Sequence, residues 1–234
     1  MPDGAKRPLI EARRLTKIYR LGASEVVGIN HIDFHVPAGE LVVLKGNSGS
    51  GKTTLLALLA GLDKPTEGDL TVAGQDLKTA SPEQLTRYRR EVVGMVFQSF
   101  NLLPTLTVLE NVALPALLAG RLRRQVEAKA RHLLAWLNLT PRLHHLPAQL
   151  SGGEMQRTAI ARALINDPSI ILADEPTGNL DSQNGEVVME LFRSLNSEFG
   201  TTVIIATHSN LADAIATTKI SLKDGAVTDR ACSV

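Results

Sequence analysis

The feature that most constrains this chain is a glycine-rich turn, Gly46-Asn47-Ser48-Gly49-Ser50-Gly51-Lys52-Thr53-Thr54. It follows the apolar run 41–44, which is typical of a buried strand, and it precedes the run 55–60, which contains no turn residue and is typical of a helix. A turn of the form G-x-x-x-x-G-K-[ST] between a strand and a helix predicts a cradle for phosphate groups. The flanking elements disfavour the competing interpretation, a turn that only connects strand to helix.

The residue types in this turn suit a phosphate ligand. Gly46, Gly49 and Gly51 can adopt backbone angles that a side chain would forbid, so successive N–H groups can point at one anion. The start of the following helix adds a partial positive charge, and Lys52 adds a full one. We expect the Thr53 hydroxyl to ligate a Mg²⁺ ion that bridges the same phosphates.

Composition indicates an ordinary globular protein without a nucleic-acid signature. The chain has 234 residues, 44% hydrophobic and 21% charged, which suits one α/β domain with or without a subdomain. Lys and Arg number 25 against 24 Asp and Glu, so the net charge of +1 predicts no general attraction for nucleic acid or acidic lipid. The single cysteine, Cys232, excludes an internal disulfide and fits a reducing compartment.

We expect neither a secretory signal nor a membrane-spanning segment. The residues Met1 to Pro8 carry charge, but no apolar core follows them. No apolar run approaches the ~20 residues that are needed to cross a bilayer. If this chain serves a membrane, we expect another protein to cross it.

The order of the predicted elements indicates an α/β fold. Residues 9–20 predict a strand and a turn, whereas residues 20–31 receive no assignment. Further strands are predicted at 32–36, 41–44, 69–73, 92–97, 169–173 and 202–206, with a hairpin at 218–229 that turns at Asp224-Gly225. Helices are predicted at 55–60, 81–91, 125–137, 159–164 and 183–199. Residues 99–155 carry helical patterns interrupted by prolines, so we expect an all-helical insertion there.

Two carboxylates follow the apolar strand 169–173. Because ligands of parallel sheets bind beyond the carboxyl ends of the strands, Asp174 is expected at the same edge as the phosphate loop. There it could hold Mg²⁺, and Glu175 could polarise a water for attack on a terminal phosphate. The alternative is an Asp-Glu pair in a solvated turn.

Two further polar residues end apolar strands. Gln98 could orient a water or ligate the metal, and His208 could donate to the terminal phosphate. Their alternatives remain open, because Gln98 could be a polar strand end and His208 a helix cap.

The stretch Leu150-Ser151-Gly152-Gly153-Glu154-Met155-Gln156-Arg157 begins a second helix suited to an anion. Ser151 is a good N-cap, and Glu154 completes a capping box. Two glycines just inside a helix start weaken the helix by about 1 kcal/mol each relative to alanine. They leave backbone N–H groups open to the close approach of an anion. The alternative is a well-capped helix that needs no ligand.

This ordered set of motifs resembles the nucleotide-binding subunit of ATP-binding cassette (ABC) transporters. The motifs that carry the resemblance are the phosphate loop 46–54, Gln98, Leu150-Ser151-Gly152-Gly153, Ile170 to Glu175, Asn179-Leu180-Asp181 and His208. The resemblance covers residues 9–228 and implies a P-loop NTPase core with a mostly parallel sheet, an N-terminal antiparallel β subdomain and an α-helical subdomain. In this single ABC ATPase domain, residues 1–234, about 9–98 and 156–228 would form the core with the β subdomain. Residues of about 99–155 would form the helical subdomain.

The resemblance also implies Mg²⁺-dependent hydrolysis of ATP. Residues that would bind ATP are Tyr19, which would stack on adenine, Gly46, Asn47, Ser48, Gly49, Ser50, Gly51, Lys52, Thr53 and Thr54. Thr53, Gln98 and Asp174 would serve the metal. Lys52 and His208 would stabilise charge on the γ-phosphate, Glu175 would act on the attacking water, and Gln98 would link hydrolysis to a membrane partner.

The partners implied by the resemblance are a second copy of the chain and a membrane protein. In a head-to-tail homodimer, each ATP would lie between the phosphate loop of one subunit and Ser151, Gly152 and Gly153 of the other, and Asp181 would cross the interface. The segments 61–68, 93–104 and 110–115 are similar to the subgroup that serves lipoprotein release and macrolide export. This subgroup implies an integral membrane permease with few transmembrane helices, no nucleic acid, and a peripheral position on the cytoplasmic face of the inner membrane.

Two other hypotheses belong to different functional classes. A soluble cassette ATPase that acts on DNA or ribosomes would usually carry a second cassette or a long insertion, and neither is present. A regulatory module that binds nucleotide without hydrolysis is disfavoured by the presence of both Glu175 and His208.

Overall fold

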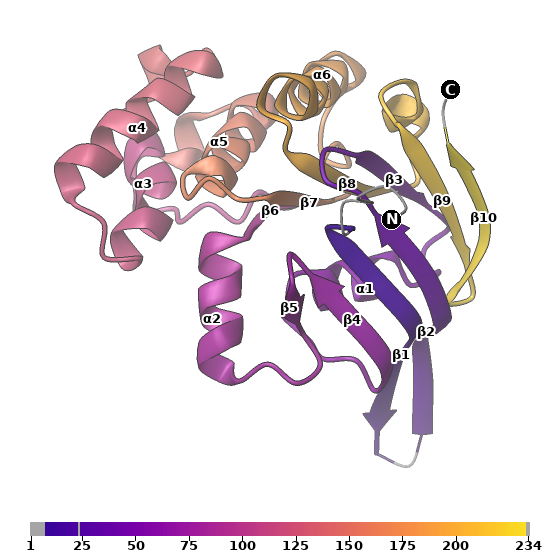
Figure 1. Ribbon diagram of the computed structural model, residues 1–234. Helices are drawn as coiled ribbons and strands as arrows, with labels where there is room; N and C mark the ends of the chain where they lie inside the picture. The colour runs from indigo at the N-terminus through magenta and orange to yellow at the C-terminus, as the bar shows by residue number, and fades with distance from the viewer. Residues whose placement is uncertain (1–7, 23, 233–234) are drawn as a thin grey trace, which may run out of the picture.

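The computed structural model describes residues 8–22 and 24–232 and contains two β-sheets with helices packed around them (Figure 1). Residues 1–7, which make up most of the segment where no secretory signal is expected, lie outside the described residues, as does the side chain of Cys232. No helix among the described residues is long and apolar enough to cross a membrane.

The larger sheet is mostly parallel, as the sequence predicts. Its strands, in the order β10-β9-β3-β8-β7-β6, are β10 (Ala226–Cys232), β9 (Thr218–Lys223), β3 (Leu41–Lys45), β8 (Thr202–Thr207), β7 (Ile170–Asp174) and β6 (Val93–Phe97). Only the β9–β10 pair is antiparallel. Its turn falls at Asp224-Gly225, where both residues have positive φ, so the predicted hairpin is confirmed.

The smaller sheet is antiparallel and has the strand order β2-β1-β4-β5. Its strands are β1 (Ile10–Leu21), β2 (Ser24–Val36), β4 (Glu67–Val72) and β5 (Gln75–Asp76). The sequence predicts only residues 32–36 of β2, because the burial of the strand alternates there but not in its exposed first half. Instead of ending in a turn before residue 20, β1 continues to Leu21 with register shifts in its pairing to β2.

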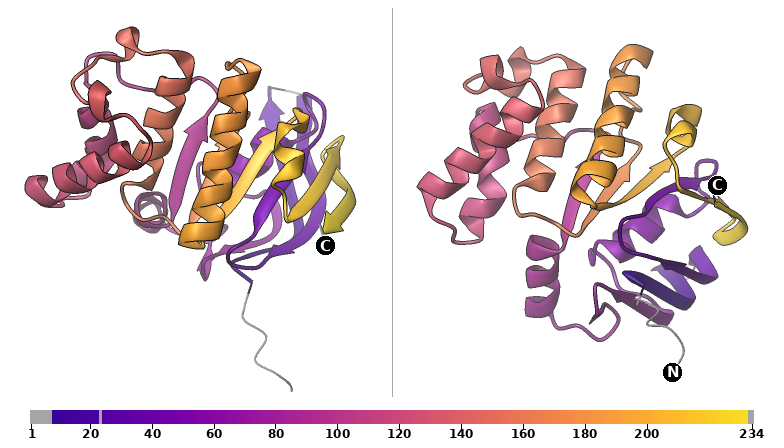
Figure 2. Two further views of the ribbon diagram at one scale, coloured as in Figure 1. Left: turned by 90° about the horizontal axis from the view of Figure 1, so that it is seen from above. Right: turned by 45° about the horizontal axis from the view of Figure 1, so that its top comes forward.

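The helices cover both faces of the parallel sheet. They are α1 (Lys52–Leu59), α2 (Pro82–Glu91), α3 (Val108–Leu118), α4 (Arg123–Trp136), α5 (Gly152–Leu164) and α6 (Ser182–Phe199), with 3₁₀ turns at 140–142, 147–149 and 210–214. Helices α5 and α6 run side by side over one face of the sheet (Figure 2). Helix α1 lies on the other face, between the two sheets (Figure 1).

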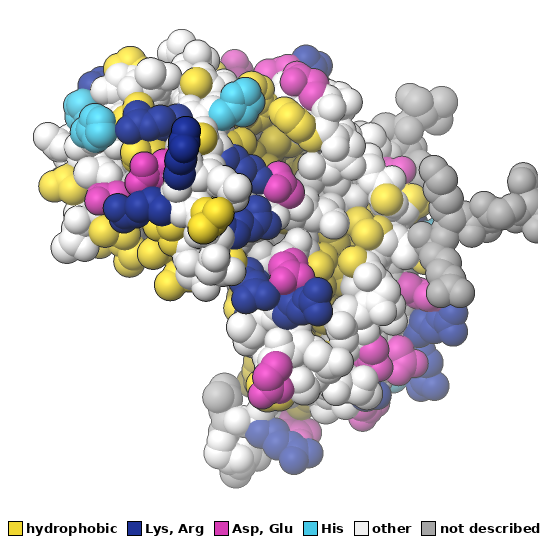
Figure 3. All heavy atoms as spheres, turned by 60° about the vertical axis from the view of Figure 1, so that its left-hand side comes forward, with side chains coloured by type: hydrophobic (Ala, Val, Ile, Leu, Met, Phe, Trp, Pro, Cys, Tyr) yellow, Lys and Arg dark blue, Asp and Glu magenta, His cyan; other side chains and the backbone are white. Residues whose placement is uncertain are grey.

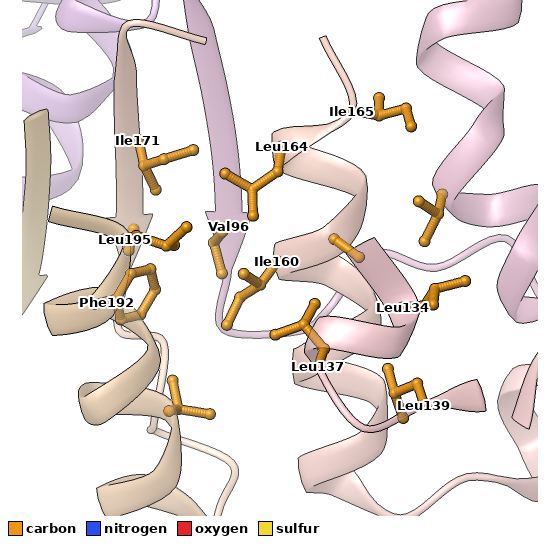
Figure 4. Close-up of a cluster of buried hydrophobic side chains, with 14 of the residues drawn as sticks. Val96, Leu134, Leu137, Leu139, Ile160, Leu164, Ile165, Ile171, Phe192 and Leu195 are labelled. Atoms are coloured by element: carbon orange, nitrogen blue, oxygen red, sulfur yellow. The ribbon is translucent and has the colours of Figure 1, made fainter. Parts of the chain in front are cut away.

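Successive residues of each buried strand therefore enter different cores. Val43 and Ile171 pack with the helices α3 to α6, whereas Leu44 and Leu172 pack with α1 and the antiparallel sheet. Figure 4 shows the first of these cores, where side chains of α5 and α6 gather beside β6 and β7. Because both faces of the strands are buried, their sequences are continuously apolar.

The middle of the chain is largely helical. Residues 98–107 are not helical, and α3 and α4 follow them. Helix α5 begins at Gly152 and continues without interruption past position 155, where the sequence places the end of the insertion. The limits of the subdomains stay a prediction.

Candidate functional site

One pocket collects most of the predicted site residues. Its volume is about 670 Å³, within the range of ligand-binding sites. It lies beyond the carboxyl ends of β3, β6, β7 and β8, where open α/β sheets bind ligands. The residues that line it are Tyr19, Val26, Val27, Gly28, Asn47, Ser48, Gly49, Ser50, Gly51, Lys52, Thr53, Thr54, Gln98, Asp174, Glu175 and His208.

The glycine-rich turn curls around the ammonium group of Lys52. This Nζ donates to the Gly46 carbonyl at 2.6 Å and to the Asn47 carbonyl at 3.2 Å, and the side chain is almost fully buried. Gly51 precedes α1 with φ at 102°, and a Cβ there would lie 2.5 Å from the Gly28 carbonyl oxygen. No side chain caps the start of α1, and its first turn contains no acidic residue. The N–H groups of that turn are therefore suited to an anionic ligand.

Thr53 and Asp174 form an oxygen-rich corner of the pocket. The Thr53 hydroxyl donates to Asp174 Oδ1 across 3.4 Å. Burial raises the pKa of the Asp174 carboxyl above its usual value, a shift that the Thr53 bond opposes. No group of three His, Cys, Asp or Glu side chains that could hold a metal occurs among the described residues. A hydroxyl with one carboxylate fits Mg²⁺, which takes oxygen ligands from few side chains and completes its shell with water and phosphate.

Glu175 is held in place from the end of β8. Thr207 Oγ1 donates to Glu175 Oε2 at 2.9 Å, and the backbone N–H of His208 donates to the same carboxylate at 3.2 Å. The ring Nδ1 of His208 lies 3.0 Å from Glu175 Oε1, and Lys52 Nζ lies 3.9 Å from that oxygen. Glu175 also has φ at 44°, and an unfavourable backbone of this kind is common at functional sites.

Gln98 is held at the pocket wall by the segment after β7. Its Nε2 lies 3.4 Å from Asn179 Oδ1, and Asn179 Nδ2 donates to the Gln98 carbonyl at 3.0 Å. Gly178 allows this approach, because a Cβ there would lie 2.6 Å from Gln98 Nε2.

Five predicted site residues are absent from the lining of the pocket. One is Gly46 of the phosphate loop, whose carbonyl accepts a hydrogen bond from Lys52. The other four, Ser151, Gly152, Gly153 and Asp181, mark the starts of α5 and α6. Ser151 caps α5 and forms the predicted capping box with Glu154. Asp181 caps α6 by accepting from the Asn184 N–H at 2.8 Å. The structure thus divides the predicted residues into two separate groups on one chain.

Some pocket residues were missed by the sequence analysis. Val26, Val27 and Gly28 lie in the unassigned stretch, and the two valines are about half exposed beside Tyr19. No sequence signal distinguishes them, because the strand is exposed on both faces at that point. Thr207, which holds Glu175 but does not line the pocket, is also not predicted, although its position at the end of an apolar strand next to His208 is a usable signal.

Known proteins match this chain in sequence and in structure. The family model described as "ABC transporter" matches residues 29–178. The macrolide export ATP-binding/permease protein MacB of Rhodopirellula baltica is 47% identical over 94% of this chain and 33% of its own length. The lipoprotein-releasing system ATP-binding protein LolD of Idiomarina loihiensis is 44% identical over 93% of this chain and 95% of its own length.

A solved structure extends the likeness to the fold. The dimeric post-hydrolysis state of the ATP-binding cassette MJ0796, bound to ADP and Pi, has a TM-score of 0.88 and 40% identity. The match covers 95% of this chain and 98% of that one. The chain spans about a third of the MacB relative and nearly all of the LolD relative. The chain therefore belongs to the ABC transporter family, as an ATPase cassette of the subgroup that includes the lipoprotein-release and macrolide-export proteins.

Proposed function

We propose that this cassette binds Mg²⁺ and ATP in the pocket, hydrolyses the γ-phosphate bond and thereby drives a membrane-embedded partner. The observation that carries the proposal is the position of the Glu175 carboxylate. It lies 3.9 Å from the Lys52 ammonium, in the pocket lined by the phosphate loop. A carboxylate held beside the phosphate cradle is placed to act on a water that attacks the terminal phosphate.

Nucleotide binding would use both ends of the pocket. The half-exposed side chains of Val26 and Val27 offer apolar surface beside Tyr19 for the base. The loop from Asn47 to Thr54 supplies N–H groups, and Lys52 supplies a full positive charge for the phosphates. Lys52 now donates to two loop carbonyls, so its ammonium is already held inside the cradle.

Thr53, Asp174 and Gln98 would hold Mg²⁺, since each has a side-chain oxygen and all three line the pocket together with the phosphate loop. The ion, when bound, would neutralise charge on the β- and γ-phosphates and orient them. Glu175 would accept a proton from the attacking water. The bonds from Thr207 and from the His208 backbone fix the carboxylate. The exposed His208 ring, which now contacts Glu175, would turn toward the γ-phosphate to act as a donor.

A second copy of the chain would complete the site. Ser151, Gly152 and Gly153 form an anion-suited helix start that does not line the pocket of their own chain. A head-to-tail dimer would place this helix start, with its partial positive charge, over the phosphates held by the other subunit. Asp181, at the neighbouring helix start, would then lie at the interface. The dimeric MJ0796 cassette supports this arrangement.

The membrane partner would dock in a groove of about 570 Å³ that lies between α2 on one side and α3 and α5 on the other (Figure 3). Leu62, Met95 and Leu118 give it apolar surface, and Arg89 gives it positive charge, whereas Arg90 is paired with Glu91. No acidic residue lines the groove within the described part of the chain. We therefore infer a permease segment that is apolar and carries a carboxylate.

We propose that this partner is a permease with few transmembrane helices and that the cassette lies on the cytoplasmic face of the inner membrane. The similarity to MacB, an ATP-binding/permease protein, and to LolD supports a permease partner. The same relatives favour transport over a soluble ATPase that acts on DNA or ribosomes and over a regulatory module without hydrolysis. No nucleic-acid partner is proposed.

The variant Glu175→Gln tests the proposal. It keeps the shape of the side chain but removes the base, so we expect ATP binding to persist and turnover to fall by at least about 100-fold. Size-exclusion chromatography with Mg²⁺ and ATP should then show a trapped dimer. Glu198→Gln, at the exposed end of α6, is the matched control and should hydrolyse ATP normally. Normal hydrolysis by Glu175→Gln, or a strictly monomeric variant, would contradict the proposal.

A further inference from the structure

The segment that follows Gln98 contains a strained turn. Phe100 and Asn101 are consecutive residues with left-handed backbones, at φ of 59° and 50°. This conformation is unfavourable for residues with a side chain, above all for a bulky one such as phenylalanine. A pair of this kind persists where neighbouring groups hold it in place.

The guanidinium of Arg162, on α5, holds this turn. Its Nη2 donates to the Phe100 carbonyl at 2.8 Å, and its Nη1 donates to the Asn101 carbonyl. Burial lowers the pKa of Arg162, and within the described residues no carboxylate contributes to that shift. The two carbonyls are therefore the acceptors that compensate the buried charge. The rigid fork of a guanidinium suits two adjacent acceptors, which a lysine ammonium does not match.

The turn is short enough to control Gln98. The Phe100 N–H donates to the Phe97 carbonyl at 3.3 Å, so the turn closes directly on the end of β6 with Gln98 inside it. On the other side, Asn179 donates to the Gln98 carbonyl. Gln98 is thus fixed between the segment after β7 and a turn that is tied to α5.

The same segment forms a wall between two cavities. Phe97, Asn101 and Arg162 line the groove proposed for the membrane partner, whereas Gln98 lines the nucleotide pocket. Helix α5 also carries Gly152 and Gly153 at its start. If a partner in the groove displaced Arg162, its bonds to the Phe100 and Asn101 carbonyls would move the turn and with it Gln98 in the nucleotide pocket.

We propose that Arg162 is a positioning residue for Gln98, because its guanidinium holds the left-handed turn that ties the end of β6 to helix α5. The inference rests on the proposed function, since it assigns Gln98 a task in ATP hydrolysis. Whether Arg162 holds the turn can be measured without nucleotide. The inference and the proposed function can therefore fail separately.

Hydrogen exchange of the nucleotide-free cassette tests the holding of the turn. In Arg162→Lys, which keeps the charge but loses the fork, we expect amides 99–103 to exchange at least about fivefold faster than in the wild type. Arg193→Lys is the matched control, because Arg193 makes a forked contact to Glu190 on the exposed face of α6. It should leave exchange of these amides unchanged.

Steady-state kinetics test the consequence for Gln98. We expect Arg162→Lys to lower kcat about tenfold while the KM for ATP stays within about twofold, since the phosphate loop is untouched. Glycine adopts a left-handed backbone at little cost in free energy, so adding Asn101→Gly to Arg162→Lys should make the turn easier to form. The double variant should therefore recover part of the lost protection from exchange and part of the lost kcat.

Unchanged exchange at 99–103 in Arg162→Lys would overturn the proposal. A KM that rises as much as kcat falls, or a double variant that recovers neither quantity, would also overturn it. If the wild type hydrolyses no ATP but amides 99–103 still exchange faster in Arg162→Lys, then the proposed function is wrong. The role of Arg162 in holding the turn is then still supported. Far-ultraviolet circular dichroism of each variant excludes global unfolding as the cause.

Discussion

The hydroxyl of Thr207 donates to the Glu175 carboxylate at 2.9 Å, from a side chain that is 1% exposed. The same hydroxyl accepts the N–H of Ser209 at 3.0 Å. It therefore joins the end of β8 to the residue proposed as the base.

Thr207→Val tests the importance of that bond. Valine keeps the shape and burial of the side chain but offers Glu175 no donor, so we expect kcat to fall about tenfold with little change in the KM for ATP. Thr207→Ser keeps the hydroxyl and should stay close to the wild type. Steady-state ATPase assays measure both, and wild-type kcat in Thr207→Val would show that the bond does not position Glu175.

Asp174→Asn tests the cost of a buried carboxylate. Burial raises the pKa of Asp174, so the charged form destabilises the folded protein at neutral pH. Without nucleotide, we expect the variant to have a higher free energy of unfolding in urea than the wild type. With Mg²⁺ and ATP, it should lose most of the stabilisation that the wild type gains from the ligand. A variant that is less stable than the wild type in EDTA would refute this account.

Glu154→Gln tests a pH-dependent contribution to stability. Glu154 accepts the Ser151 N–H and the Arg142 guanidinium, and these bonds lower its pKa from 4.5 to about 2. The contribution is therefore complete above pH 4.5 and is lost as the pH falls toward 2. At pH 7 we expect the free energy of unfolding of the wild type to be about 2 kcal/mol higher than that of the variant. This difference should become smaller as the pH falls. Urea titrations from pH 7 to pH 3 measure this difference. A difference that stays constant over this range would contradict the role given to the Glu154 charge.

Gly153→Ala tests the close packing of the two helix starts. A Cβ at position 153 would lie 2.3 Å from Asn184 Oδ1, and Asp181 holds that asparagine through two hydrogen bonds. The added methyl should displace Asn184 and weaken the cap of α6 at a cost of about 1 kcal/mol. Alanine should stabilise α5 by about the same amount, so we expect little net change in the free energy of unfolding.

Adding Asn184→Ala to Gly153→Ala gives a double-mutant cycle for this contact. In the Asn184→Ala background the methyl group should stabilise the protein by about 1 kcal/mol, because the clash is gone and only the gain in α5 is left. If Gly153→Ala changes the free energy of unfolding equally in both backgrounds, then the packing against Asn184 does not require a glycine at position 153.

Local sequence determined much of this fold and of its candidate site. The strand, glycine turn and helix around Lys52 are contiguous, so their pattern predicts a phosphate cradle without knowledge of the rest of the chain. Asp174, Glu175, Gln98 and His208 were placed at one edge because parallel strands end together. All four do line the pocket with Lys52.

Contacts between distant segments were decided only by the tertiary structure. The bond from Thr207 to Glu175, and the bonds from Arg162 to the turn at Phe100, join residues far apart in the chain whose side chains carry no periodic signal. The valines of β2 reach the pocket because β2 pairs with β1 beside Tyr19. Periodicity reports which face of an element is buried, whereas the partner on that face depends on how the sheets and helices pack.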